Sequence, residues 1–165
     1  MTGVCIDIET TGFSKNDSII SISLIKFTGP RVDDIFPTLI NPGRSIPEFI
    51  TEITGINNSM VLGFPGFNGK LVDDIKRFVR YHKMYAYNAP FEARFMKNVF
   101  LRDVEVLDVM NPIRTHFKFN KSLKLIEAAK HFKLETREVH TSLNDALICF
   151  NLINILNRTG YVWEI

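Results

Sequence analysis

Two acidic residues stand in a short apolar stretch near the start of the chain. Asp7 and Glu9 lie two residues apart, so in a β-strand their side chains point to the same face. Acids are poor strand residues and two like charges on one face repel, which a divalent cation with a preference for oxygen ligands would relieve. A solvated strand face is the simpler alternative, but the neighbouring Val4, Ile6 and Ile8 favour a strand that is buried on at least one side.

Two further acids and a histidine stand near expected helix starts. Glu92 follows a corner between a strand and a helix, Asp145 lies in the last expected helix, and His140 directly precedes that helix. Each has an ordinary alternative role, because an acid in a first turn suits the helix dipole and a histidine often starts a helix or packs in a core. Together, four carboxylates and a histidine suit phosphodiester hydrolysis, in which two metal ions bridge the phosphate and a base with a near-neutral pKa takes the water proton.

The elements that must position these residues form an α/β pattern. Three strands are expected first, as an antiparallel meander, followed by a surface excursion and then by strands that alternate with helices. We therefore predict one domain over residues 1–165 with a mixed sheet. The expected strands are 3–9, 18–27, 32–40, 84–87 and 104–109, and the expected helices are 48–53, 67–81, 91–100, 122–132 and 142–156.

Composition excludes several classes of protein. The 165 residues are 45% hydrophobic and 23% charged, as in ordinary globular domains, and no stretch is apolar for long enough to span a membrane or resembles a signal peptide. The formal net charge of +2 predicts no strong non-specific grip on nucleic acid, although it leaves room for a small basic strip. Cys5 and Cys149 lie in apolar stretches and read as reduced, buried thiols. We expect a soluble, cytoplasmic protein.

Several short segments, in this order and spacing, resemble the DnaQ-like, DEDDh-type 3′→5′ exonucleases, the family of the proofreading subunit of bacterial replicative DNA polymerase. Each segment alone is weak evidence for this family, whereas the ordered set is specific to it. The resemblance implies a ribonuclease H-like fold, with a five-stranded mixed sheet flanked by helices. The matching segments are 7–12, 41–43, 46–47, 53–56, 88–95, Asp108 and 140–146.

The resemblance also implies roles for individual residues. Asp7, Glu9 and Asp145 would hold two divalent metal ions, Mg²⁺ or Mn²⁺, with Glu92 on the second ion partly through water, and His140 would be the general base. For three of the implied substrate contacts, Phe13, Ile56 and Phe91, plain core packing stays open. The implied substrate-binding residues are Thr10, Thr11, Gly12, Phe13, Ile56, Asn88 and Phe91, with the backbone of the two threonines at the 3′-hydroxyl.

The sequence departs from the family pattern at Glu92, where the family normally has Asp. The extra methylene lengthens the reach by roughly 1.5 Å, which is large for a catalytic site. We therefore expect an active enzyme with altered metal preference, favouring Mn²⁺ over Mg²⁺. Thr54 and Ser142, where relatives often carry His and Ala, put substrate contacts in doubt and leave the chemistry unchanged.

The implied activity is hydrolysis at the 3′ end of single-stranded nucleic acid, with release of nucleoside 5′-monophosphates in proofreading, DNA repair or degradation. DNA is favoured over RNA because the segments are closer to the proofreading type than to the short-oligoribonucleotide type. The alternative is a catalytically weakened module that binds nucleic-acid ends or a polymerase. A DNA polymerase partner and a homodimer both remain open, and the short C-terminus after the last expected helix leaves no long docking tail.

Overall fold

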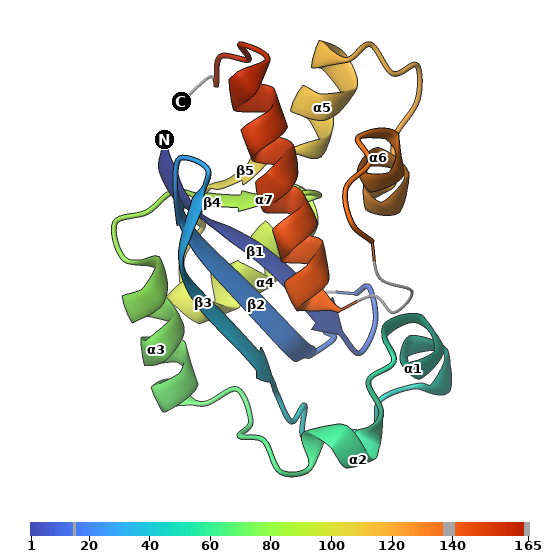
Figure 1. Ribbon diagram of the computed structural model, residues 1–165. Helices are drawn as coiled ribbons and strands as arrows, with labels where there is room; N and C mark the ends of the chain where they lie inside the picture. The colour runs from blue at the N-terminus through green and yellow to red at the C-terminus, as the bar shows by residue number, and fades with distance from the viewer. Residues whose placement is uncertain (15, 137–140, 164–165) are drawn as a thin grey trace.

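The computed structural model describes residues 1–14, 16–136 and 141–163. Its sheet has five strands in the order β3-β2-β1-β4-β5 (Figure 1). The strand β2 is antiparallel to both of its neighbours, β1 and β3, whereas β1, β4 and β5 are parallel. The expected meander with added parallel strands is therefore confirmed. The strands are β1 (Thr2–Thr10), β2 (Ile19–Thr28), β3 (Arg31–Leu39), β4 (Met84–Ala86) and β5 (Val106–Asp108).

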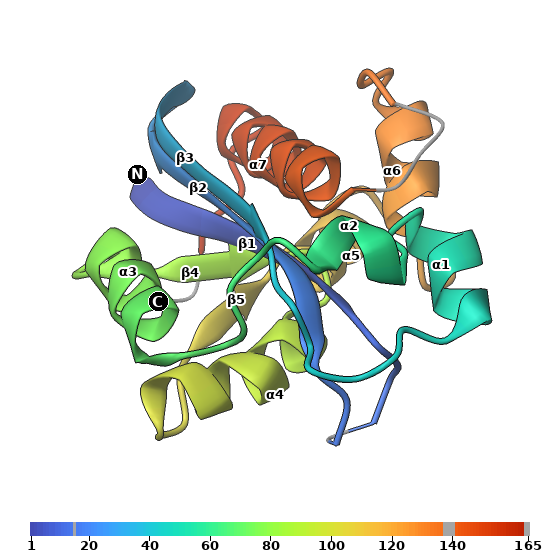
Figure 2. The ribbon, with the colours of Figure 1, turned by 90° about the horizontal axis from the view of Figure 1, so that it is seen from below.

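Helices cover both faces of the sheet (Figure 2). Alternate residues of β1 enter different cores: Val4 and Ile6 pack with α3 (Gly69–Val79) and α4 (Ala89–Phe100), whereas Cys5 packs with α7 (Ser142–Arg158). The α7 side also holds α5 (Met110–His116) and α6 (Leu125–His131). Since strand side chains alternate, Asp7 and Glu9 share the face that α7 covers.

The expected elements are mostly right in kind and differ at their ends. The helix expected at 122–132 begins only at Leu125, because the Glu127 carboxylate accepts from the Lys124 backbone N–H at 2.9 Å and fixes the start there. Likewise, the helix expected at 67–81 is α3, which Asn68 caps, and the strand expected at 104–109 is only the three-residue β5.

Two short helices were not expected. The helix α2 (Asn58–Val61) follows α1 (Glu48–Thr54) and has only four residues, too few to show a helical period. The helix α5 contains Pro112, which breaks a sequence pattern but is tolerated in a first turn, where the missing N–H has no partner to lose.

Both cysteines are free and buried, as expected. Among the described residues, no helix is long and apolar enough to cross a membrane.

Candidate active site

Three of the predicted carboxylates come together where α7 crosses β1. Ligand oxygens of Asp7, Glu9 and Asp145 all lie within 4.8 Å of one another. Asp145 reaches the cluster from the first turn of α7, which begins where the Thr141 hydroxyl accepts from the Asn144 N–H at 3.2 Å. All three acids are partly buried. This is the convergence from separate elements that a metal centre requires.

Burial and mutual repulsion raise the pKa values of two of these acids, Asp7 and Glu9. Burial raises the pKa of Asp7 well above its ordinary value, and the charges of Glu92, Glu9 and Asp145 raise it further. Burial and the charge of Asp145 raise the pKa of Glu9 to about 7. Hard oxygen ligands whose mutual repulsion is this strong fit one or more divalent cations, whose positive charge would offset both burial and repulsion.

Glu92 lies beside this cluster but is not one of the three acids within 4.8 Å of one another. Its side chain, in the first turn of α4, is only 5% exposed, and its Oε2 atom has no hydrogen-bond partner among the described residues. Burial raises its pKa to about 8, with further contributions from Asp108 and Glu9, against a lowering by its own backbone. A buried oxygen without a partner is costly, and a second cation or its bound water would satisfy it.

These raised pKa values predict how stability depends on pH when metal is absent. Between pH 4.5 and 8 the folded protein holds protons on Glu9 and Glu92 that the unfolded chain has released, so the free energy of unfolding falls as pH rises. One pKa unit corresponds to about 1.4 kcal/mol, so we expect a loss of several kcal/mol across this range. Thermal unfolding in chelator at pH 5, 6, 7 and 8 measures it. Saturating Mn²⁺ should remove most of the fall, and a flat profile in chelator would contradict the electrostatic account.

Asp108 supports the site through two hydrogen bonds to backbone N–H groups. Its Oδ1 accepts from the Ala89 N–H at 3.1 Å and its Oδ2 accepts from the Asn111 N–H at 2.8 Å. One carboxylate thus joins the starts of α4 and α5, which places the first turn of α4, and with it Glu92, against the sheet. The sequence resemblance included Asp108 but gave it no role.

The turn after β1 is shaped by Asp17, a residue that the sequence analysis missed. Its carboxylate accepts from the Thr11 hydroxyl at 3.0 Å and from the Ser14 N–H at 2.8 Å, and these bonds lower its pKa. A Cβ atom on Gly12 would lie 2.6 Å from the same carboxylate, so any other residue there would displace the Asp17 side chain from these hydrogen bonds. An acid a few residues after a glycine turn was the available signal.

The predicted substrate residues in this turn divide into structural and exposed groups. Thr10 and Thr11 are buried; the Thr10 hydroxyl donates to the Gly12 carbonyl and the Thr11 N–H donates to the Ser18 carbonyl at 2.8 Å. The Thr11 N–H is therefore already used. Phe13 is 65% exposed, so it is not a core residue and its ring is accessible to a ligand.

The remaining predicted contacts also differ in exposure. Ile56 is 6% exposed and packs in an apolar cluster with Ile46 and Ile50, which matches the core-packing alternative. Phe91 is half-buried against the core, with its ring centroid 5.2 Å from that of Phe95. Asn88 is exposed at the start of α4, and its side chain makes no capping hydrogen bond. The predicted base, His140, lies outside the described residues.

Three buried serines tie α7 to the sheet, and the sequence analysis did not foresee them as a group. The Ser142 hydroxyl lies 2.7 Å from that of Ser21 and 2.8 Å from that of Ser23. The two β2 serines are directly opposite the two acids of β1, and Ser142 is three residues before Asp145. The hydroxyls thus fix the start of α7 relative to the carboxylates. Ser142 is the position where relatives often carry Ala.

Ser142→Ala should lower the free energy of unfolding by about 1–3 kcal/mol, because it strands two buried hydroxyls. The triple variant Ser21→Ala/Ser23→Ala/Ser142→Ala removes all three hydroxyls together and should recover part of that loss. Urea denaturation of the three proteins measures both effects. A triple variant that is less stable than Ser142→Ala would show that the serines do not act as a cluster.

Comparison with known proteins gives this geometry a family context. An exonuclease family model, RNase_T, matches residues 4–153. The chain is 35% identical over 150 residues to the PolC-type DNA polymerase III of Clostridium perfringens, covering 87% of this chain and 10% of that one. It is 31% identical over 170 residues to the 3′-5′ exonuclease DinG of Bacillus subtilis, covering 96% of this chain and 18% of that one.

The DNA polymerase III subunit epsilon of Aquifex aeolicus is a relative of more similar length. It is 30% identical over 173 residues, covering 99% of this chain and 85% of that one. By contrast, the chain spans only about a tenth of the length of the PolC-type relatives that it matches.

Solved structures share the fold at low sequence identity. Exonuclease X in complex with 5′ overhanging duplex DNA has a TM-score of 0.72 at 21% identity, over 98% of this chain and 95% of that one. A zinc-bound complex of E. coli exonuclease I with single-stranded DNA has a TM-score of 0.82 at 16% identity, over 96% of this chain and 41% of that one. The expected ribonuclease H-like fold is confirmed.

Proposed function

Because this chain belongs to the DnaQ-like exonuclease family, we propose that residues 1–165 form one domain that removes nucleotides from the 3′ end of single-stranded nucleic acid. The observation that carries the proposal is the convergence of Asp7, Glu9 and Asp145 within 4.8 Å. Three partly buried acids, two of them with raised pKa values, have no evident structural role there. A divalent metal pair gives them one.

The proposed roles of the site residues are metal binding, proton transfer and substrate binding. Asp7, Glu9 and Asp145 would hold the divalent ions, and Glu92 would hold the second ion, partly through water. Bound Mg²⁺ or Mn²⁺ supplies Lewis-acid stabilisation of the phosphate and a more acidic water. His140 removes a proton from that water. The turn after β1 receives the terminal nucleotide, with Phe13 against its sugar or base and Asn88 beside it.

We propose DNA as the preferred substrate and nucleoside 5′-monophosphates as the products. Support comes from the relatives, which are DNA polymerase III proteins and a 3′-5′ exonuclease, and from two solved structures of similar fold, which are complexes with DNA. A DNA polymerase partner for proofreading has the same support.

A time course on single-stranded DNA labelled at its 5′ end tests the activity. We expect a ladder that shortens from the 3′ end with Mg²⁺ or Mn²⁺, and no cleavage in chelator. The same oligonucleotide with a 3′-terminal phosphate blocks the end and should be cut far more slowly. Absence of cleavage on DNA and on RNA of the same sequence, in both metals, would reject the enzyme in favour of a module that only binds nucleic-acid ends.

Glu92→Asp tests the proposed role of the longer side chain. The natural protein should be more active with Mn²⁺ than with Mg²⁺, because Mg²⁺ demands near-ideal octahedral geometry and tolerates a displaced carboxylate poorly. The shorter Asp should move the ratio of kcat/KM in the two metals toward Mg²⁺. Glu127→Asp is a matched control on another helix. An equal ratio in the natural protein and Glu92→Asp would show that Glu92 does not set metal choice.

A further inference from the structure

A hollow lies at the amino ends of β4 and β5, away from the three acids. It has a volume of about 550 Å³ and is lined by the end of α3, the start of β4 and the segment between α4 and β5. The strand register gives the position of the hollow along the sheet. Met84, at the start of β4, pairs with Val4 of β1, five residues before Glu9. At about 3.3 Å per strand residue, roughly 10 Å of β1 separates this level of the sheet from Asp7 and roughly 16 Å separates it from Glu9.

The hollow carries a local excess of positive charge. Its charged lining residues are Lys76, Arg80, Lys83, Arg102, Asp103 and Glu105. Four cations against two carboxylates give an excess of two positive charges, which equals the formal net charge of the entire chain. Asp103 is also paired with Lys97 at 2.9 Å, outside the lining. A local excess of cations around a hollow attracts a polyanion.

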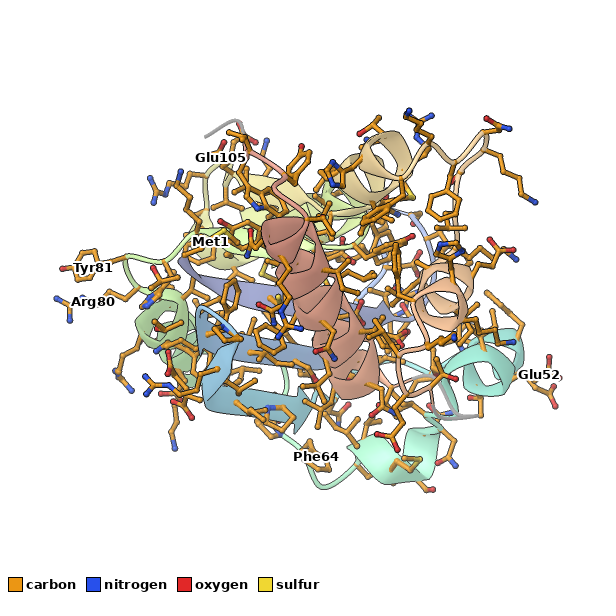
Figure 3. The ribbon with its side chains drawn as sticks, turned by 45° about the horizontal axis from the view of Figure 1, so that its top comes forward. Met1, Glu52, Phe64, Arg80, Tyr81 and Glu105 are labelled. Atoms are coloured by element: carbon orange, nitrogen blue, oxygen red, sulfur yellow. The ribbon has the colours of Figure 1, made fainter. Side chains whose placement is uncertain are left out.

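An exposed aromatic ring stands at the rim in a backbone conformation that side chains seldom adopt. Tyr81 has a φ of 64° and is 90% exposed, so packing does not offset the strain. The Arg80 guanidinium lies 4.6 Å from the ring centroid and donates to the Tyr81 hydroxyl at 2.8 Å. Figure 3 shows these two side chains together, projecting away from the fold. An exposed ring beside a cation suits a nucleobase stacked next to its phosphate.

We propose that this hollow is an accessory site for the sugar-phosphate backbone of single-stranded nucleic acid, with one base stacked on Tyr81. It holds the strand several nucleotides upstream of the 3′ end that lies at the carboxylates. The proposal rests on the proposed exonuclease function for the direction of the strand. It goes beyond that function because it assigns a binding role to residues remote from the reaction.

Equilibrium binding in chelator tests the site independently of cleavage. Fluorescence anisotropy of a labelled 20-nucleotide single-stranded DNA gives Kd for the natural protein, for Arg80→Ala/Lys83→Ala, and for the control Lys130→Ala/Arg158→Ala. The control removes the same charge from exposed positions at the ends of α6 and α7. We expect about a tenfold rise in Kd for the first variant, and a salt slope that is shallower by about 1.4 for two lost phosphate contacts. Equal Kd values for the two double variants would overturn the site.

Substrate length separates an upstream site from a role at the 3′ end. In active protein with metal, Arg80→Ala/Lys83→Ala should raise KM for the 20-nucleotide strand and leave kcat/KM for a trinucleotide within twofold. Equal losses on both lengths would overturn the upstream placement. If the natural protein cuts neither strand, the exonuclease proposal fails, and the binding measurement in chelator still decides the accessory site.

Tyr81→Gly separates binding from folding. Glycine adopts a positive φ without strain, so the melting temperature should stay the same or rise, while Kd for the 20-nucleotide strand rises at least fivefold. Tyr81→Phe keeps the ring and should bind within twofold of the natural protein. Natural affinity in Tyr81→Gly would remove the stacking contact from the proposal.

Discussion

Asp7→Asn is expected to reduce 3′→5′ hydrolysis by about 10⁴-fold or more, the largest effect of any single replacement in this chain. Asp7 is the acid on which the charges of Glu92, Glu9 and Asp145 all act, so it stands at the centre of the cluster. Removal of its charge weakens the hold on both proposed ions at once. Turnover of single-stranded DNA at saturating Mn²⁺ measures the loss.

The same replacement should make the metal-free protein more stable. The raised pKa of Asp7 shows that its ionised form is disfavoured in the folded state, and Asn keeps the shape without the charge. We expect a higher melting temperature than the natural protein in chelator at pH 8, and a smaller gain when Mn²⁺ is added. Asp73→Asn, on the exposed side of α3, is the control and should change neither quantity. Ordinary turnover in Asp7→Asn would refute the metal-site assignment.

The part of the site that the sequence predicted is the part that local geometry determines. Asp7 and Glu9 share a face because side chains alternate along any strand, and their flanking apolar residues already showed that the strand is buried. The start of α7 was predicted at Ser142 because apolar residues recur there at helical spacing. These conclusions need no knowledge of how distant segments pack.

The part that the sequence could not predict depends on packing between distant segments. Nothing local indicates that Ser142 meets Ser21 and Ser23, more than a hundred residues earlier, because isolated serines are common in strands and at helix starts. The burial of Ile56 and the exposure of Phe13 likewise follow from which cluster each element joins. The sequence pattern around both residues was the same, an apolar side chain near a turn.

The role of Glu92 was implied by the family resemblance, and its burial is known only from the structure. The resemblance gave the position a metal-binding role and identified the longer side chain as a departure. The structure adds that this side chain is buried and that one of its oxygens has no partner among the described residues. The extra methylene therefore has not turned the carboxylate out to solvent, which favours retained metal chemistry over a module that only binds.

His140→Ala is expected to lower kcat by about 10²–10⁴-fold, the usual contribution of a general base. His140 itself lies outside the described residues, and the expectation comes from its family position and from its neighbours. Thr141, the next residue, caps α7, and Asp145, one turn into that helix, belongs to the metal cluster.

The effect should fall on turnover and spare binding. Because the imidazole accepts a proton and holds no metal, Kd for a single-stranded 3′ end in chelator and the Mn²⁺ concentration for half-maximal activity should both stay within about threefold of the natural values. The natural protein should gain activity as pH rises through the ordinary histidine pKa near 6.5, and His140→Ala should lose that rise. His131→Ala, at an exposed histidine of α6, is the matched control. An unchanged kcat in His140→Ala would assign the proton transfer to another group.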